Sequence, residues 1–231
     1  MSSRPSTQPR PRALLTQERI LRAAIELADE AGIEALSMRR LGTKLGVKAM
    51  TLYYHVGKKD DLLASIVDIV INEIELPAAD LQWKIALRRC AMSAHEVLVR
   101  HRWAANLVLQ PRGPDPAHLR YMNAVLGTLR RAGFTVEQTH HAYHALDSHV
   151  LGFTLWEVGM NLGSEQDVRA LAAAFLPEIP PELRYLAEHV EHHTKPRDPA
   201  EKEEFAFGLD LILDGLERML DESSRQPRTE R

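Results

Sequence analysis

Four side chains that can bind a nucleic acid lie on one face of a short helical stretch. Lys48, Thr51, Tyr54 and His55 supply a cation, a hydroxyl, a phenol and an imidazole, at spacings close to whole helical turns. Helical periodicity brings positions so spaced to the same side. Groups of these kinds hydrogen-bond to phosphate oxygens and to base edges. The stretch therefore predicts a surface for contact with a nucleic acid.

Two short helices and a tight turn are expected to position this face. Ser37 has the side chain of a helix N-cap, and Leu41 and Leu45 give the first helix an apolar face. Gly46 follows, where the end of a helix often requires a positive φ. Val47 is expected to pack inward before a second helix of about six residues. This order, over about 37–56, predicts a helix-turn-helix whose second helix enters the DNA major groove.

The longer segment 15–74 carries a resemblance to a known family. It rests on Ile20-Leu21-Arg22-Ala23-Ala24 with Leu27, Ala31-Gly32, Leu36-Ser37-Met38-Arg39-Arg40-Leu41, Leu45-Gly46-Val47, Thr51-Leu52-Tyr53-Tyr54-His55-Val56 and Lys59-Asp60-Asp61-Leu62-Leu63. This run resembles the DNA-binding domain of the tetracycline-repressor (TetR) family of transcription regulators. The resemblance implies an all-α fold, a DNA operator as partner and, most often, repression.

The resemblance also implies which residues contact DNA. The family's contact positions fall here on Arg39, Lys48, Ala49, Thr51, Tyr53, Tyr54, His55 and Lys59. Arg39 matches a base-contacting position on the first motif helix, and Lys59 matches a phosphate-contacting lysine at the start of the next helix. Thr51, Tyr53 and His55 match phosphate contacts, and the other three positions face the groove and set sequence preference.

Composition limits the class of protein. Hydrophobic residues make up 45% of the chain and charged residues 26%, as is typical of soluble domains. Neither an apolar run of roughly 20 residues nor a signal-peptide core is present, so we expect a cytoplasmic protein. The resemblance to the TetR family implies that it is bacterial. The single cysteine, Cys90, excludes an internal disulfide. Residues 1–62 contain 11 Lys and Arg against 7 Asp and Glu, and the remainder contains 18 against 25. The net positive charge therefore lies in the segment with the predicted helix-turn-helix.

The chain is expected to have two domains and two tails. Residues 1–13 read as a disordered basic tail, 14–76 as the helix-turn-helix domain, 80–222 as a regulatory and dimerisation domain, and 223–231 as a second disordered tail. The basic tail is interpreted either as a solvated segment or as an additional DNA contact.

Helical periodicity and breaker residues give the expected helices. The first runs from Thr16 to Gly32, and a fourth runs from Lys58 or Lys59 to about Glu75. The second domain is expected to be entirely helical, with a long Pro- and His-rich linker over 177–199. Its helices are expected at about 80–101, 103–109, 115–132, 135–160, 165–175, 181–190 and 200–221.

Methionine and aromatic residues of the second domain suit an apolar ligand cavity with a few polar groups, although any one of them is typical of an ordinary core. The candidate pocket residues are Trp83, Cys90, Met92, Ala94, His95, Trp103, Val108, Arg112, Met122, Val125, Phe134, Phe153, Trp156 and Glu157. A weaker resemblance to the family's tetracycline-binding branch includes Glu157, which matches an acidic position. Val108 stands where that branch has a metal-ligating histidine. We therefore expect an uncharged or hydrophobic effector, without metal or other cofactor.

The last helix has an apolar stripe at spacings of three and four residues. The resemblance implies that the helices at 135–160 and 200–221 form a four-helix dimer interface, whereas packing of the stripe onto its own subunit remains an alternative. A two-fold dimer would present two reading helices about 34 Å apart to a palindromic operator. The predicted interface residues are Leu146, Val150, Leu209, Leu213, Leu216 and Leu220.

Eleven histidines raise the hypothesis of a metal site. His140 and His144 are spaced i, i+4, and Glu137 with His140 forms one Glu-x-x-His step, but a di-iron bundle requires a second step that the sequence lacks. We interpret these residues, and the histidines within 189–193, as polar or interface side chains.

We predict a non-enzymatic, homodimeric repressor that a small, largely apolar effector releases from DNA. The alternatives are a metal-dependent helical-bundle enzyme and a DNA-binding protein without an effector.

Overall fold

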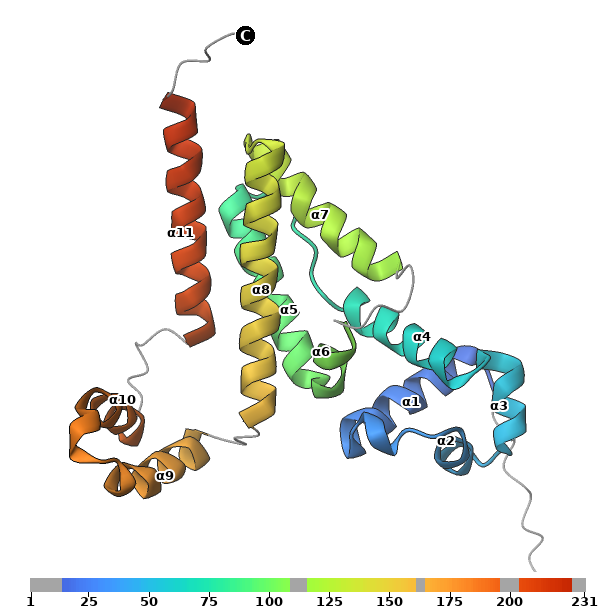
Figure 1. Cartoon of the computed structure of the whole chain (residues 1–231). Helices are drawn as coiled ribbons and strands as arrows, with labels where there is room; N and C mark the ends of the chain where they lie inside the picture. Colours follow the sequence, from blue (N-terminus) through green and yellow to red (C-terminus); the bar gives the residue numbers. More distant parts are fainter. Residues whose placement is uncertain (1–13, 109–115, 161–164, 196–203, 226–231) are drawn as a thin grey trace, which may run out of the picture. The chain divides into compact units, whose positions relative to one another are not determined.

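The computed structural model describes residues 14–108, 116–160, 165–195 and 204–225, and every regular element within these ranges is a helix (Figure 1). This confirms the predicted all-α fold. The chain divides into two compact units, Met1–Ile66 and Val67–Arg231, which we call unit 1 and unit 2. The boundary falls inside α4 (Lys59–Asn72).

Unit 1 contains α1 (Gln17–Ala31), η1 (Ile33–Ala35), α2 (Met38–Leu45), α3 (Ala49–Val56) and the first half of α4. Thr16 caps α1 by accepting a hydrogen bond from the backbone N–H of Arg19 at 3.2 Å, and Gly32 ends the helix with a φ of 78°. Both boundaries are as the sequence predicts. The α3 helix has eight residues rather than the expected six.

The core of unit 1 forms because apolar residues recur at helical spacing on every helix. Ile20, Leu41, Leu52 and Leu62 come from four different helices and are fully buried. Unit 1 therefore has a core of its own under the two motif helices.

The α4 helix ends three residues before the predicted Glu75. After Asn72, the backbone N–H groups of Glu73 and Ile74 bond to carbonyls three residues back, which tightens the chain into a turn. The N–H of Glu75 instead donates to Ser93 Oγ at 2.9 Å. The prediction was too long because this bond to α5 replaces another helical turn.

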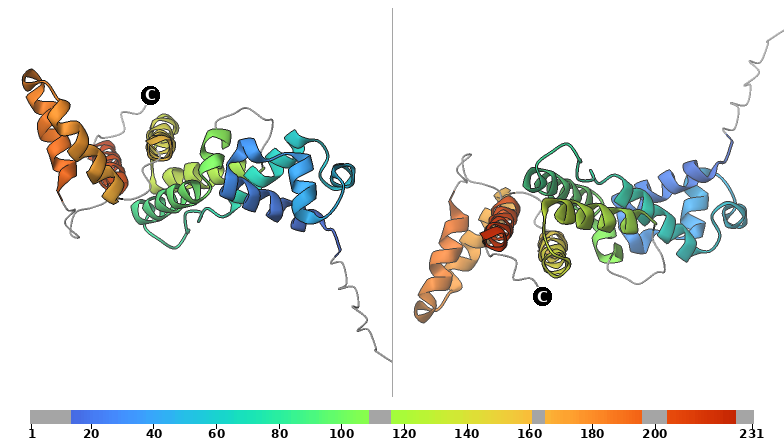
Figure 2. Two further views of the ribbon diagram at one scale, coloured as in Figure 1. Left: turned by 90° about the horizontal axis from the view of Figure 1, so that it is seen from below. Right: turned by 90° about the horizontal axis from the view of Figure 1, so that it is seen from above.

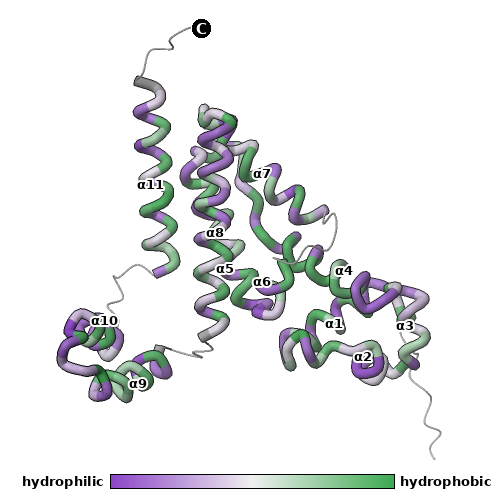
Figure 3. The backbone as a smooth tube through the Cα atoms, viewed as in Figure 1, coloured by the Kyte–Doolittle hydropathy of each residue, from purple (hydrophilic) through white to green (hydrophobic). Residues whose placement is uncertain are grey.

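The main body of unit 2 is built from five helices: α5 (Trp83–Arg100), α6 (Arg102–Val108), α7 (Pro116–Ala132), α8 (Val136–Met160) and α11 (Glu204–Arg225). The α5 helix lies against the other four. The α8 and α11 helices run alongside each other, and Figure 2 views both nearly end-on. In Figure 3 polar and apolar residues are interspersed along both, as expected of helices with one buried face.

The predicted linker 177–199 is wrong in part, because most of its described residues are helical. The turns η2 (Leu176–Glu178) and η3 (Pro181–Leu183) lead into α10 (Arg184–Thr194). The α10 helix pairs with α9 (Glu165–Phe175), and both views of Figure 2 show the two side by side. Pro177 and Pro181 lie in the first turns of η2 and η3, where the fixed φ of proline is favourable.

Ion pairs and apolar burial together fix α11 onto its own chain. Lys84 Nζ of α5 lies 2.7 Å from Asp214 Oδ1 and 2.5 Å from Glu217 Oε2. Arg88 Nε lies 2.7 Å from Asp210 Oδ1.

In the described part of the chain, none of the helices is long and apolar enough to cross a membrane.

Candidate functional site

The outer face of α3 carries the predicted DNA-contacting residues. Leu52 and Val56 are buried and hold the helix, whereas Thr51, Tyr53 and His55 are exposed. Four of the remaining predicted positions are also exposed, namely Lys48, Tyr54, Arg39 on α2 and Lys59 at the start of α4. Ala49 is half-buried. Tyr54, at 88% exposed, has no packing role in unit 1.

The turn before α3 depends on two glycines. Gly46 adopts the left-handed conformation, with φ 69° and ψ 31°, as predicted. Gly42 lies inside α2, and a Cβ there would approach Val47 O to 2.8 Å and Ala49 N to 3.3 Å. Both of these atoms are backbone, so α3 could not pack as closely against α2 with any other residue at position 42. Sequence reasoning missed this role, although a glycine inside a helix is a signal for it.

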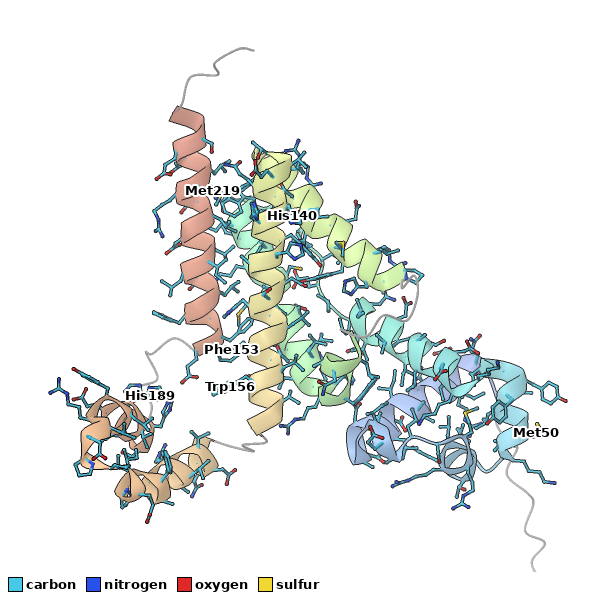
Figure 4. The ribbon with its side chains drawn as sticks, viewed as in Figure 1. Met50, His140, Phe153, Trp156, His189 and Met219 are labelled. Carbon is cyan, nitrogen blue, oxygen red and sulfur yellow. The ribbon has the colours of Figure 1, made fainter. Side chains whose placement is uncertain are left out.

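Sequence reasoning also missed Met50, which is 67% exposed on α3 (Figure 4). An exposed apolar side chain on a groove-entering helix can contact the methyl group of thymine. The backbone N–H of Lys58 donates to Asp61 Oδ2 at 2.8 Å, which caps the start of α4 and fixes the backbone beside Lys59.

Unit 2 contains a small cavity of about 20 Å³. The end of α4 and the residues after it, and helices α5 to α8, contribute its walls. Two predicted pocket residues, Ala94 and Val108, line it. The lining residues are Ile71, Ile74, Ala94, Leu98, Val108, His118, Tyr121, Asp147, Val150 and Leu151.

Three polar residues of the cavity, His118, Tyr121 and Asp147, were absent from the prediction. Burial raises the pKa of Asp147, and the charges of His118 and His144 act in the opposite direction. Burial also raises the pKa of Tyr121 well above its ordinary value. Both groups are spaced along their helices like ordinary core positions, so the sequence has no motif that marks them.

The predicted residue Cys90 is buried on α5 close to this site. Burial, with a smaller effect of Glu75, raises the pKa of its thiol to about 12. The thiol is therefore uncharged and behaves as a small apolar core group.

A second group of predicted pocket residues gathers around His95 on α5. Its ring stacks on Phe205 of α11 with centroids 4.0 Å apart, and its Nε2 lies 3.2 Å from Glu157 Oε2. The Thr154 hydroxyl donates to the Val150 carbonyl, so His95 Nδ1 is the donor in its 2.9 Å contact with Thr154 Oγ1.

Aromatic rings extend this cluster along α8. Phe153 lies 5.6 Å from both Phe205 and Trp156, measured between ring centroids, and Figure 4 shows Phe153 and Trp156 on the same stretch of α8. Trp156 is 54% exposed. Sequence reasoning placed Phe153 and Trp156 here but missed Phe205 and Thr154.

The other predicted pocket residues do not join either group. Trp83 packs edge-on against Phe134 at 5.2 Å, and Trp103 is buried beside the ring of His101. Val125 is buried, Met92 and Met122 are half-buried, and Arg112 lies outside the described residues. Of the predicted pocket residues, Ala94 and Val108 line the cavity, His95, Phe153, Trp156 and Glu157 form the cluster at α8, and a single pocket for the whole set stays a prediction.

Comparison with known proteins bears on both units. Residues 20–66 match the family "Bacterial regulatory proteins, tetR family", and residues 76–220 match "Tetracyclin repressor-like, C-terminal domain". The second match alone covers more than half of the chain. The chain belongs to the TetR family of DNA-binding transcription regulators.

Individual TetR-family relatives agree with this assignment. The class D tetracycline repressor of Escherichia coli is 32% identical over 90% of this chain and 92% of its own. An HTH-type transcriptional regulator of Saccharopolyspora erythraea is 36% identical over 150 residues, which span 64% of this chain and 64% of that protein. The structure of the TetR family protein ActR of Streptomyces coelicolor in complex with actinorhodin has a TM-score of 0.68 and 26% identity, with 93% of this chain and all of that one covered.

The residues predicted for a TetR-type dimer interface pack within the single chain. Leu146, Val150, Leu209, Leu213 and Leu216 are buried within the single chain, and Leu220 is half-buried. The apolar stripe packs onto the protein's own α5 and α8, which is the alternative reading of the sequence. The outer faces of α8 and α11 carry other residues, namely Ala145, Ser148, Gly152, Phe207, Leu211 and Gly215.

The histidine pairs lie in the described part of unit 2. The rings of His140 and His144 are 4.6 Å apart, and those of His189 and His193 are 5.0 Å apart. Within the described ranges, no group of three or more His, Cys, Asp or Glu side chains is arranged to hold a metal ion.

Proposed function

We propose that this TetR-family chain is a homodimeric repressor, released from a palindromic operator by a small, largely apolar effector. The observation that carries the proposal is that Ile71 of α4, and Ile74 just after it, line the apolar cavity of unit 2. Since α4 continues without a break into unit 1, a ligand in that cavity would touch the helix that leads to the DNA-binding residues.

Polar contacts also tie the end of α4 to the rest of unit 2. Asp68 Oδ1 accepts a hydrogen bond of 2.8 Å from the backbone N–H of Ala117, in the first turn of α7. Arg120 donates to Asn72 Oδ1 at 2.8 Å. A ligand that separates α7 from α4 would break these bonds and alter how α4 is held.

The size of the cavity supports a two-state response. A volume of about 20 Å³ is enough for roughly one water molecule. An effector would therefore bind a state in which the surrounding helices have moved apart. To act, it must bind the DNA-incompetent state more tightly, and the usual coupling is about 1–3 kcal/mol, or 5–150-fold in affinity.

The proposed dimer uses the outer faces of α8 and α11. Small residues such as Ala145, Ser148 and Gly152 on α8 allow another helix to approach closely, and Phe207 and Leu211 on α11 are each 57% exposed. Two-fold pairing would present two α3 helices about one DNA turn, roughly 34 Å, apart.

The effector is proposed to bind without a metal. Val108 lines the cavity, and its side chain has no donor atom for a metal ion. Repression is supported by the class D tetracycline repressor, a relative 32% identical to this chain.

The experiment begins with selection of operator DNA from random duplexes by the full-length protein. Release of the selected duplex is then titrated with tetracycline plus Mg²⁺ and with a panel of apolar aromatic compounds. We expect release by a member of the panel and none by the metal–tetracycline pair. Release at micromolar metal–tetracycline would contradict the metal-free site, and DNA affinity that no compound changes would favour a repressor without an effector. Tyr54→Ala, which alters only the outer face of α3, is the control for specific DNA binding.

A further inference from the structure

The wall of the cavity contains a carboxylate that the proposed function leaves unexplained. Asp147 of α8 lines the cavity together with His118 and Tyr121 of α7. The other seven lining residues are aliphatic. A carboxylate surrounded by aliphatic side chains costs free energy unless a positive group pairs with it.

The groups that act on Asp147 compensate for its burial only in part. Desolvation is the largest influence on its pKa and raises it. The opposing charges come from His118 and His144. An imidazole is a weaker and pH-dependent counter-charge compared with the permanent cation of arginine. A cation that entered the cavity would therefore gain an electrostatic partner that the protein has left incompletely neutralised.

The residues beside Asp147 suit a flat aromatic ligand. The rings of His118 and Tyr121 lie 6.3 Å apart and meet edge to face. Tyr121 is 9% exposed, and its buried phenol is neutral, so it adds an aromatic face and a hydroxyl without adding charge. The neutral ring of Tyr121 next to a carboxylate favours a delocalised cation.

We propose that the cavity binds a largely apolar, aromatic compound that carries one protonated nitrogen, which the Asp147 carboxylate holds. This inference rests on the proposed function, since it takes the cavity as the effector site. It refines the expectation of an uncharged effector, because the positive charge is confined to one point of the ligand while the aliphatic wall contacts the remainder.

The test uses two ligands with the same three-ring framework. At neutral pH 9-aminoacridine is a cation and acridine is neutral. Binding of each to the full-length protein is measured by fluorescence and calorimetry without DNA, since acridines also bind duplexes. We expect at least about tenfold tighter binding of 9-aminoacridine, which corresponds to about 1.4 kcal/mol.

Asp147→Asn keeps the shape of the side chain and removes its charge. It should abolish the preference for 9-aminoacridine and leave the affinity for acridine unchanged. Asp80→Asn, at an exposed aspartate before α5, is the matched control and should bind both probes as the wild type does. Ala94→Phe fills the cavity and should weaken both probes. Circular dichroism and thermal unfolding establish that each variant folds.

Three results would overturn the proposal. The first is equal affinity of the wild type for the two probes, which includes no binding of either. The second is a preference for 9-aminoacridine that survives in Asp147→Asn. The third is undiminished binding of the probes by Ala94→Phe. Operator release separates this inference from the proposed function. Asp147-dependent binding that never releases an operator would support the cation site and reject the ligand-controlled repressor. Operator release by neutral compounds, to the same extent in the wild type and in Asp147→Asn, would support the ligand-controlled repressor and reject the cation site.

Discussion

His149 of α8 occupies the space that a side chain at position 208 of α11 would need. A Cβ on Gly208 would lie 2.6 Å from His149 Cε1 and 3.2 Å from its Nε2. The same imidazole is bonded through Nε2 to the backbone carbonyl of Phe205, at 2.9 Å. The absence of a side chain at Gly208 therefore lets α8 and α11 share this hydrogen bond.

Gly208→Ala should destabilise unit 2, because the ring of His149 must move and its bond to Phe205 must break. We expect a loss of about 1–3 kcal/mol in the free energy of unfolding, as for other overpacked cores. Urea unfolding followed by circular dichroism measures it. Gly127→Ala is the control, since its Cβ would approach only the flexible end of Arg131, at 3.1 Å. That variant should be unchanged or gain up to about 1 kcal/mol from helix propensity. Equal effects of the two substitutions would show that the contact at Gly208 is unimportant.

The predicted DNA-contacting residues should separate into residues that position the protein on the DNA and residues that recognise bases. Lys59→Ala should weaken binding to every duplex and reduce the slope of log affinity against log salt by about 1. Arg39→Ala should cost about 1–3 kcal/mol on the operator and relax preference at one base pair per half-site. Titrations at several salt concentrations on operator and random DNA measure both. Equal losses on the two duplexes for Arg39→Ala would exclude a reading role for that residue.

Two leucines of α11, two residues apart, should respond differently to the same substitution. Leu213 is fully buried against its own chain, so Leu213→Glu should prevent stable folding of unit 2. Leu211 is 57% exposed, so Leu211→Glu should leave a folded monomer that has lost tight operator binding. Sedimentation velocity and circular dichroism distinguish the two outcomes. A folded Leu211→Glu protein that still sediments as a dimer would place the interface elsewhere.

The single cysteine should be chemically inert in the folded protein. The pKa of Cys90 is raised to about 12, so almost none of the reactive thiolate exists at pH 8. We expect reaction with a disulfide reagent to be at least about 100-fold slower in the native protein than in guanidinium chloride. Labelling of the native protein at the unfolded rate would show that α5 opens readily.

The sequence predicted helix boundaries well where one residue has a strong local preference. Thr16 and Ser37 accept the N-cap bonds expected of them, and Gly46 adopts the left-handed conformation. These outcomes depend on the backbone within one helical turn, which the local sequence determines.

Long-range partners could not be predicted in this way. The stripe that includes Leu213 shows that one face of α11 is apolar, but the same pattern suits burial against the protein's own helices or against another subunit. Asp147 and Tyr121 are brought to one cavity by the packing of α7 against α8, which no local pattern encodes. The lining of the cavity was therefore predicted only in part, through Ala94 and Val108.

The attachment of α3 to unit 1 has a consequence for how such a regulator can change its target. Gly42, Leu52 and Val56 hold the helix from its inner side, whereas Met50 and Tyr54 project outward without supporting the core. Substitutions at the outer positions therefore carry little penalty in stability. Evolution can therefore substitute these residues when the operator sequence changes. New DNA-sequence preferences can arise without passing through variants that fail to fold.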